Sequence, residues 1–209
     1  MPEEIALATW LQLNRKYTSG EALINSTFEE LSVAYGNAGR HYHTLAHIAQ
    51  LLTLQQQYEA QITDNDSLTF AIFFHDIVYN AVKKDNEEKS AMAAQAYLSR
   101  IAYPAEKIGR VVDFINATHS HINASKEPDL DYFLDFDLQI LGADPATYQL
   151  YTQQIRQEYS IYPDLLYNAG RRKVLQHFLE MPAIFRTAGC RNLYEQQARE
   201  NIHAELNNL

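Results

Sequence analysis

The sequence is poor in cysteine, glycine and proline, and it has no long apolar run. Cys190 is the only cysteine among 209 residues, so the chain can form neither an intrachain disulfide nor a cysteine-based zinc site. Seven glycines and six prolines leave no low-complexity linker. No segment approaches the roughly 18 consecutive apolar residues of a membrane-spanning helix. The acidic start, Met1 to Glu4, lacks the basic region of a secretory signal, so we expect a cytoplasmic protein that does not bind membranes.

Positive charge is also scarce. Seventeen Lys and Arg residues stand against 26 Asp and Glu residues, which gives a formal net charge of -9. A protein that binds a nucleic-acid polymer needs a basic face to neutralise phosphates, and this composition disfavours one. A small phosphorylated molecule needs only local positive charge or a metal ion, so such a partner is compatible with the composition.

Helical periodicity covers most of the chain. Apolar residues make up 46 % of the sequence, enough for the core of one domain. No segment alternates apolar and polar residues as a half-exposed strand would. We therefore predict an all-α fold, a single compact helical bundle of roughly eight to ten helices over residues 1–209. The pattern specifies no oligomeric state.

Capping residues give the predicted helix limits. The segment Ser26–Glu29 has the form of a capping box, which predicts that a helix begins there and runs to about Tyr35. Asp66 or Ser67 is the expected cap of a helix that runs through Ile77. Further helices are predicted over residues 44–58, 85–98, 104–115, 144–159, 163–179 and 193–206.

The first segment whose side chains could form a functional site runs from Arg40 to His47. It contains His43 and His47, whose spacing of four would place both imidazoles on one face of a helix. A pair of this kind is, on its own, more often a surface or capping feature than a site. The spacing alone therefore assigns no function.

The second segment, about thirty residues later, is the adjacent pair His75-Asp76. The pair follows the apolar run of residues 68–74, so both side chains are expected to be partly buried. Buried ionisable groups must be paired, hydrogen-bonded or metal-bound. A structural His–Asp hydrogen bond and a metal site are equally compatible with this pair alone.

The third segment contains Asp135 and Asp137. Two acids two residues apart point in different directions on a helix, so only one would face a site. Taken singly, each is better explained as a solvated acid on an amphipathic helix. Taken with the other segments, they complete a set of two imidazoles and two carboxylates, which suits a divalent metal ion that activates water.

The order and spacing of these segments resemble the H…HD…D signature of the HD-domain superfamily of metal-dependent phosphohydrolases. The surrounding residues look most like a branch of small bacterial predicted hydrolases of unassigned substrate. The matching words are Tyr42-His43-x-x-x-His47-Ile48, Phe74-His75-Asp76-x-Val78-Tyr79, Asn86-Glu87-Glu88-x-Ser90-Ala91, Thr118-x-x-His121 and Asp135-x-Asp137-Leu138-x-Ile140-Leu141-Gly142. They define a motif core at residues 40–142, followed by a helical extension at 143–209. The resemblance implies an all-α domain whose central helices present the ligands inward.

The resemblance also implies roles for individual residues. The four that match the signature would hold a divalent ion (Mn, Mg, Fe, Co, Ni or Zn). They are His47, His75, Asp76 and Asp137. Asp137 is preferred to Asp135 because it occupies the Asp-Leu position of the family word. His43 matches the histidine that protonates the leaving oxygen in cyclic-nucleotide phosphodiesterases of the superfamily, and Asp76 would act with it in catalysis or bridge two ions.

Two further histidines are candidate ligands of a second metal ion. Some superfamily members bind such an ion with histidines between the HD pair and the last Asp. His121 fits the Thr-x-x-His word and ranks above His119. A polar helix end that simply exposes two histidines explains them equally well, since His favours helix C-termini. One or two ions per chain are therefore expected.

Five residues are candidate substrate contacts: Arg40, Tyr79, Asn86, Glu87 and Arg171. The two arginines offer guanidinium forks to a phosphate, although each is more often a solvated surface charge. Tyr79 would place a hydroxyl at the mouth of the pocket or else pack in the core. Asn86 and Glu87 belong to a family word and are expected near the pocket.

These features predict an enzyme, a metal-dependent phosphohydrolase that cleaves a small, nucleotide-like phosphomonoester or phosphodiester with metal-activated water. Two alternatives stay open. One is a di-iron oxygenase on the same fold, and the other is a metal-binding regulatory module without turnover. The ligand residues do not separate them, because function depends on the pocket around the ligands.

Overall fold

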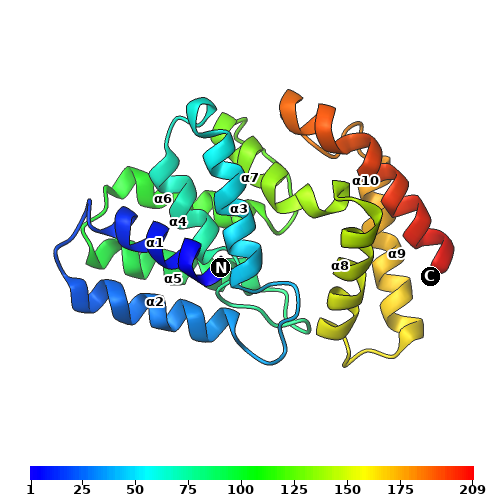
Figure 1. Ribbon diagram of the computed structural model, residues 1–209, viewed down its shortest axis with the longest axis horizontal. Helices are drawn as coiled ribbons and strands as arrows, with labels where there is room; N and C mark the ends of the chain where they lie inside the picture. Colours follow the sequence, from blue (N-terminus) through cyan, green and yellow to red (C-terminus); the bar gives the residue numbers. More distant parts are fainter. The chain divides into compact units, whose positions relative to one another are not determined.

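The computed structural model describes all 209 residues and contains ten α-helices, two short 3₁₀ helices and no strand (Figure 1). The predicted all-α fold is confirmed. No helix is both long enough and apolar enough to cross a membrane. The chain divides into two compact units, Met1–Phe133 and Leu134–Leu209, which are described separately. The predicted single domain stays a prediction.

Unit 1 is built around one apolar helix, α4, in which every residue from Ser67 to Phe74 is buried. A helix that is apolar on all sides is stable only inside a core, and α3, α5 and α6 pack against this one. Trp10 of α1 meets Phe73 edge to face, with ring centroids 5.1 Å apart. The elements are α1 (Pro2–Asn14), α2 (Glu21–Tyr35), α3 (Leu45–Gln57), η1 (Glu59–Gln61), α4 (Asn65–Phe74), α5 (Asn86–Arg100), α6 (Ala105–Ala117) and most of α7 (Pro128–Leu138).

Unit 2 is organised by its last helix, which packs against η2 and α9. Asn201 of this helix donates to the carbonyl oxygens of Leu141 and Ala143, each at 2.8 Å. Gly142 allows the close approach, because a Cβ there would lie 2.5 Å from the Cβ of Tyr194. After the end of α7, the elements are η2 (Gln139–Gly142), α8 (Pro145–Glu158), α9 (Asp164–Glu180) and α10 (Ala188–Asn208).

The predicted start of the second helix is wrong. Helix α2 begins at Glu21, and Ser26 lies inside it, where its hydroxyl donates to the carbonyl oxygen of Leu23 at 3.2 Å. The capping-box pattern is a local signal. Burial of Ile24 on the core face of α2 extends the helix toward the N-terminus beyond that signal.

The limits of α4 also differ from the prediction. Its N-cap is Asp64, whose carboxylate accepts from the backbone N–H of Ser67 at 3.2 Å, rather than Asp66 or Ser67 itself. The helix ends at Phe74 and does not continue to Ile77. The His-Asp pair therefore follows the helix instead of lying within it.

A buried carboxylate joins the N-termini of α4 and α7. Asp129 is fully buried and accepts from the backbone N–H groups of Thr63 and Asp64, each at 2.8 Å. Its carboxylate also accepts from the guanidinium of Arg110 of α6 at 2.8 Å. One side chain thus fixes the start of α4 relative to two neighbouring helices.

Replacing Asp129 with Ala would leave two backbone N–H groups without their acceptor and remove one of the carboxylates that pair with the Arg110 guanidinium. We expect the free energy of unfolding to fall by about 3 kcal/mol, as when one partner of a buried ion pair is removed. Urea denaturation measures this change. The control is Asp113→Ala on the exposed face of α6, which should change the value by less than about 0.5 kcal/mol. Equal effects of the two substitutions would contradict the role given to Asp129.

Candidate metal centre

The start of α3 and the end of α4 bring two of the predicted ligands together. Thr44 caps α3 by accepting from the backbone N–H of Ala46 at 3.3 Å, and His47 lies in the first turn, buried. His75 is the C-cap residue of α4 and is 1 % exposed. The two imidazole rings lie 5.4 Å apart, measured between centroids.

The backbone of α4 sets the proton position on His75. Its Nδ1 lies 2.9 Å from the carbonyl oxygen of Ile72. A carbonyl can only accept, so Nδ1 must carry the hydrogen of this bond. In the neutral ring the lone pair is then on Nε2, which is the arrangement found in metal-binding histidines whose other nitrogen is held by a backbone carbonyl.

The carboxylate of Asp76 meets that nitrogen. Its Oδ2 lies 3.1 Å from His75 Nε2, and the side chain is largely shielded from solvent. Two groups that both present lone pairs repel each other in a buried place unless a cation lies between them. A proton or a metal ion would meet this requirement, so the donor set is chemically suited to a divalent cation.

The cluster of unit 1 therefore consists of His47, His75 and Asp76. Asp137 lies on the continuous helix α7, one turn beyond Phe133, the last residue of unit 1, and belongs to unit 2. Its role as the fourth ligand of the ion stays a prediction.

His43 lies beside these groups but outside the helix that was predicted to carry it. Helix α3 begins at Leu45, so the prediction that His43 and His47 share a helix face is wrong. Their rings are nevertheless only 6.0 Å apart. His43 Nε2 lies 3.9 Å from Asp76 Oδ2, and its ring packs on Tyr79 with centroids 4.5 Å apart.

Arg40 holds the two histidine segments together. Its guanidinium donates to the carbonyl oxygens of Asp76 at 2.6 Å, Ile77 at 2.8 Å and His43 at 3.3 Å. It also lies over the rings of Tyr35 and Tyr79. These contacts favour a structural role for Arg40, and its predicted role as a phosphate contact stays a prediction.

The loop after the His-Asp pair is fixed from α5. Asn86 accepts from the backbone N–H of Asn80 at 3.1 Å and donates to the carbonyl oxygen of the same residue at 3.0 Å. The hydroxyl of Ser90 accepts from the N–H of Val78 at 3.1 Å. Asn86 therefore fixes the backbone of the loop that follows the His-Asp pair, and its predicted place near the pocket stays a prediction.

The two additional histidines lie just beyond the end of α6. His119 is exposed, and its Nδ1 lies 3.2 Å from the carboxylate of Glu87. His121 is half-buried and has a left-handed backbone, with φ at 50°. Their role as ligands of a second metal ion stays a prediction.

Hydrogen bonds within unit 2 occupy the carboxylate of Asp135. It is fully buried and accepts from the backbone N–H groups of Arg186 at 2.8 Å and Thr187 at 2.7 Å, and from the Thr187 hydroxyl at 2.8 Å. Burial raises the pKa of Asp135, and these hydrogen bonds oppose that rise. Thr187 is the N-cap of α10, which explains why that helix begins at Ala188 and not at the predicted residue 193.

Arg171 lies entirely within the hydrogen-bonded interior of unit 2. Its guanidinium donates to both carboxylate oxygens of Glu205, at 2.7 and 3.0 Å, and lies over the ring of Tyr151. Both members of the ion pair are nearly buried. These contacts favour a structural role, and the predicted phosphate contact stays a prediction.

Sequence reasoning overlooked two contributors to the cluster. The Ile72 carbonyl orients His75, but a backbone acceptor leaves no mark in residue type. The ring of Tyr42 lies 4.9 Å from that of His47 and 5.0 Å from that of His43, so it packs against both histidines of the first segment. Its place in the first family word was the signal that could have identified it.

No protein-family model, curated protein or solved structure matches this chain. The resemblance to the HD-domain superfamily therefore rests on the residues between positions 40 and 142. The cluster geometry is an independent observation, because it depends only on the positions and chemistry of the donor atoms.

The two acids of α7 should be separable by substitution. Asp137→Ala removes the predicted fourth donor of the ion, and we expect it to weaken binding of Zn²⁺ or Mn²⁺ at least about tenfold with little loss of stability. Asp135→Ala leaves two N–H groups buried without their acceptor, so it should lower the free energy of unfolding by about 2–3 kcal/mol. Titration calorimetry and urea denaturation measure the two quantities. The reverse ranking in metal affinity would show that Asp135 is the ligand.

The structural role of Arg40 predicts a loss of stability. Arg40→Met keeps the apolar stem but removes three hydrogen bonds to carbonyl groups, so we expect the free energy of unfolding to fall by about 2–3 kcal/mol. The matched control is Arg100→Met at the exposed end of α5. A variant as stable as the wild type, with only a raised KM for a phosphoester, would instead make Arg40 a substrate contact.

Proposed function

We propose that this protein is a metal-dependent phosphohydrolase that acts on a small phosphomonoester or phosphodiester. The observation that carries the proposal is that unit 1 brings the rings of His47 and His75 to 5.4 Å from each other, with the Asp76 carboxylate 3.1 Å from His75 Nε2. A mixed nitrogen and oxygen donor set of this composition suits a catalytic divalent ion. The ordered residues His, His-Asp and Asp also resemble the HD-domain signature.

Within this proposal, the ion would be held by His47, His75, Asp76 and Asp137. Other side chains would position these ligands and donate the proton that the leaving group needs. A bound divalent cation would lower the pKa of water and neutralise charge on the phosphoryl oxygens. Tyr79 and the Arg40 contacts would keep the His43 ring and the Asp76 backbone in a fixed relation. Such support of ligands by their neighbours is a general feature of metal sites.

His43 is the proposed general acid. It is 20 % exposed, in contrast to the nearly inaccessible His75, so it can exchange a proton with solvent. Its position beside Asp76, 3.9 Å from that carboxylate, would place its Nε2 near a leaving oxygen. General acids of this kind typically contribute 10²–10⁴-fold to a rate.

The charge of the chain favours a small substrate. With 26 acidic against 17 basic residues, it lacks the excess of cations that a phosphate polymer requires. A single phosphoryl group would need only the ion and one or two donors. A nucleotide-like monoester or diester fits this requirement.

The experiment combines turnover with metal content. We expect the Mn²⁺-loaded protein to hydrolyse bis(p-nitrophenyl) phosphate or a member of a nucleotide panel. His43→Gln should lower kcat by about 10²-fold or more and leave the metal content unchanged, and Asp76→Ala should remove both. The control is His41→Gln, an exposed neighbour in the same segment.

Three outcomes would contradict parts of the proposal. Loss of metal in His43→Gln would make this residue a ligand and not the acid. Full activity in Asp76→Ala would overturn the assignment of the site. Oxygen uptake by the iron-loaded protein, without phosphoester hydrolysis, would favour a di-iron oxygenase.

A further inference from the structure

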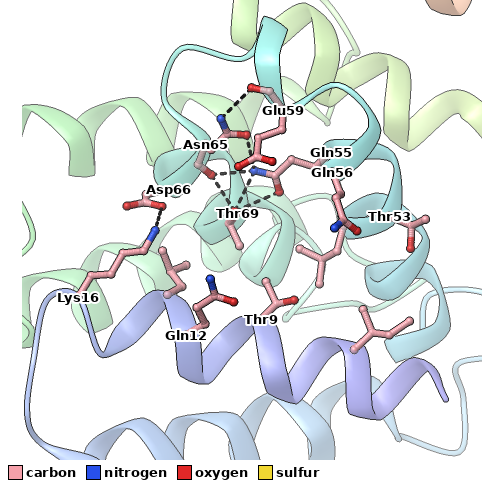
Figure 2. Close-up of a pocket in the computed structure, with 13 residues that line it drawn as sticks. Thr9, Gln12, Lys16, Thr53, Gln55, Gln56, Glu59, Asn65, Asp66 and Thr69 are labelled. Atoms are coloured by element: carbon pink, nitrogen blue, oxygen red, sulfur yellow. Dashed lines mark hydrogen bonds and ion pairs between the residues drawn. The ribbon is translucent and has the colours of Figure 1, made fainter.

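A polar groove lies on unit 1, between α1, α3 and the start of α4 (Figure 2). Its volume is about 400 Å³, within the range of small-molecule sites. Ten of its thirteen lining residues are polar or charged, and the apolar ones are Ile5, Leu13 and Leu52. The groove faces the C-terminal half of α3 and the first turns of α4. The histidines of the metal cluster lie at the opposite ends of these two helices.

The floor of the groove is pre-ordered. The buried Gln55 side chain donates to the carbonyl oxygen of Asn65 at 2.8 Å and exchanges hydrogen bonds with the hydroxyl of Thr69 at 2.9 and 3.0 Å. The amide of Asn65 is in turn bonded to the carbonyl oxygens of Glu59 and Ile62. A ligand would therefore meet a floor whose geometry is already fixed, which lowers the entropic cost of binding.

The walls carry polar groups that make no hydrogen bond within the chain. These groups are the hydroxyl of Thr9, the carboxamides of Gln12 and Gln56, and the carboxylate of Glu59 (Figure 2). Gln12 belongs to α1 and Gln56 to α3, so the two amides come from opposite walls. Each amide offers a donor and an acceptor side by side.

The charges of the groove disfavour an anion. Lys16 is the only cation in the lining, and its ammonium is 2.7 Å from the carboxylate of Asp66. Asp66 also accepts from the Tyr17 hydroxyl at 2.5 Å. The Glu59 carboxylate is left without a compensating cation. A phosphate or carboxylate ligand would meet net negative charge here, whereas an uncharged ligand would not.

We propose that this groove binds an uncharged aminopurine nucleoside. The amino and ring-nitrogen edge of adenine presents a donor beside an acceptor, which matches a glutamine amide held in two-point contact. One face of the base would pack on the exposed aliphatic side chain of Ile5, and ribose hydroxyls would donate to Glu59. The groove is a second site, and the proposal does not depend on the function proposed for the metal cluster.

Titration calorimetry of the full chain with adenosine tests the proposal, with EDTA present so that the metal cluster does not contribute. We expect saturable binding at one site per chain. Gln56→Leu should weaken it at least about tenfold, because one two-point contact is lost. The matched control is Gln57→Leu, the next residue of α3, which is exposed but does not line the groove. Thermal unfolding of both variants would verify that each is folded.

Two further ligands test the chemistry of recognition. Inosine replaces the amino donor with an acceptor and should bind more weakly than adenosine. AMP adds a phosphate and should also bind more weakly, because no free cation faces Glu59. The proposal is overturned if adenosine shows no saturable binding, if the two glutamine variants behave alike, or if inosine or AMP binds as tightly as adenosine.

Discussion

The buried His75 imidazole, held between a backbone carbonyl and a carboxylate, is the constraint on which the rest of the site depends. Its Nδ1 donates to the Ile72 carbonyl, and its Nε2 faces Asp76 Oδ2 at 3.1 Å. Helix α4 delivers this ring to a place from which water is excluded, since its last two turns are buried on all sides. A polar group in such a place needs a partner for each of its polar atoms. The cation of the proposed metal site would be one such partner, shared by His75 and Asp76.

Charged side chains hold both ends of α4. At its start, the Asp129 carboxylate accepts from Thr63 and Asp64, and at its end the Arg40 guanidinium donates to Asp76 and Ile77. The apolar middle of the helix provides burial but little orientation, because apolar contacts are not directional. The hydrogen bonds at the two ends supply the orientation that a metal site requires.

Part of this arrangement could be predicted from the sequence. An apolar run followed by His75-Asp76 indicates a buried polar pair, and helical periodicity indicates an all-α fold. The choice between two acids could not be made from the residues alone, because Asp135 is satisfied by Arg186 and Thr187, about fifty residues away. The family resemblance selected Asp137, and the contacts of Asp135 now supply a physical reason for that choice. Arg40 also could not be assigned from the sequence. Its guanidinium would suit a phosphate, but in the structure it donates to the carbonyl oxygens of Asp76 and Ile77, which are distant in sequence.

X-ray absorption spectroscopy of the protein loaded with one equivalent of Zn²⁺ tests the central claim most directly. We predict a first shell of mixed nitrogen and oxygen ligands at about 2.0–2.2 Å, with the outer-shell scattering of two imidazole rings. Those rings are His47 and His75. A shell of oxygen atoms without imidazole scattering, or a protein that retains no zinc, would contradict the account.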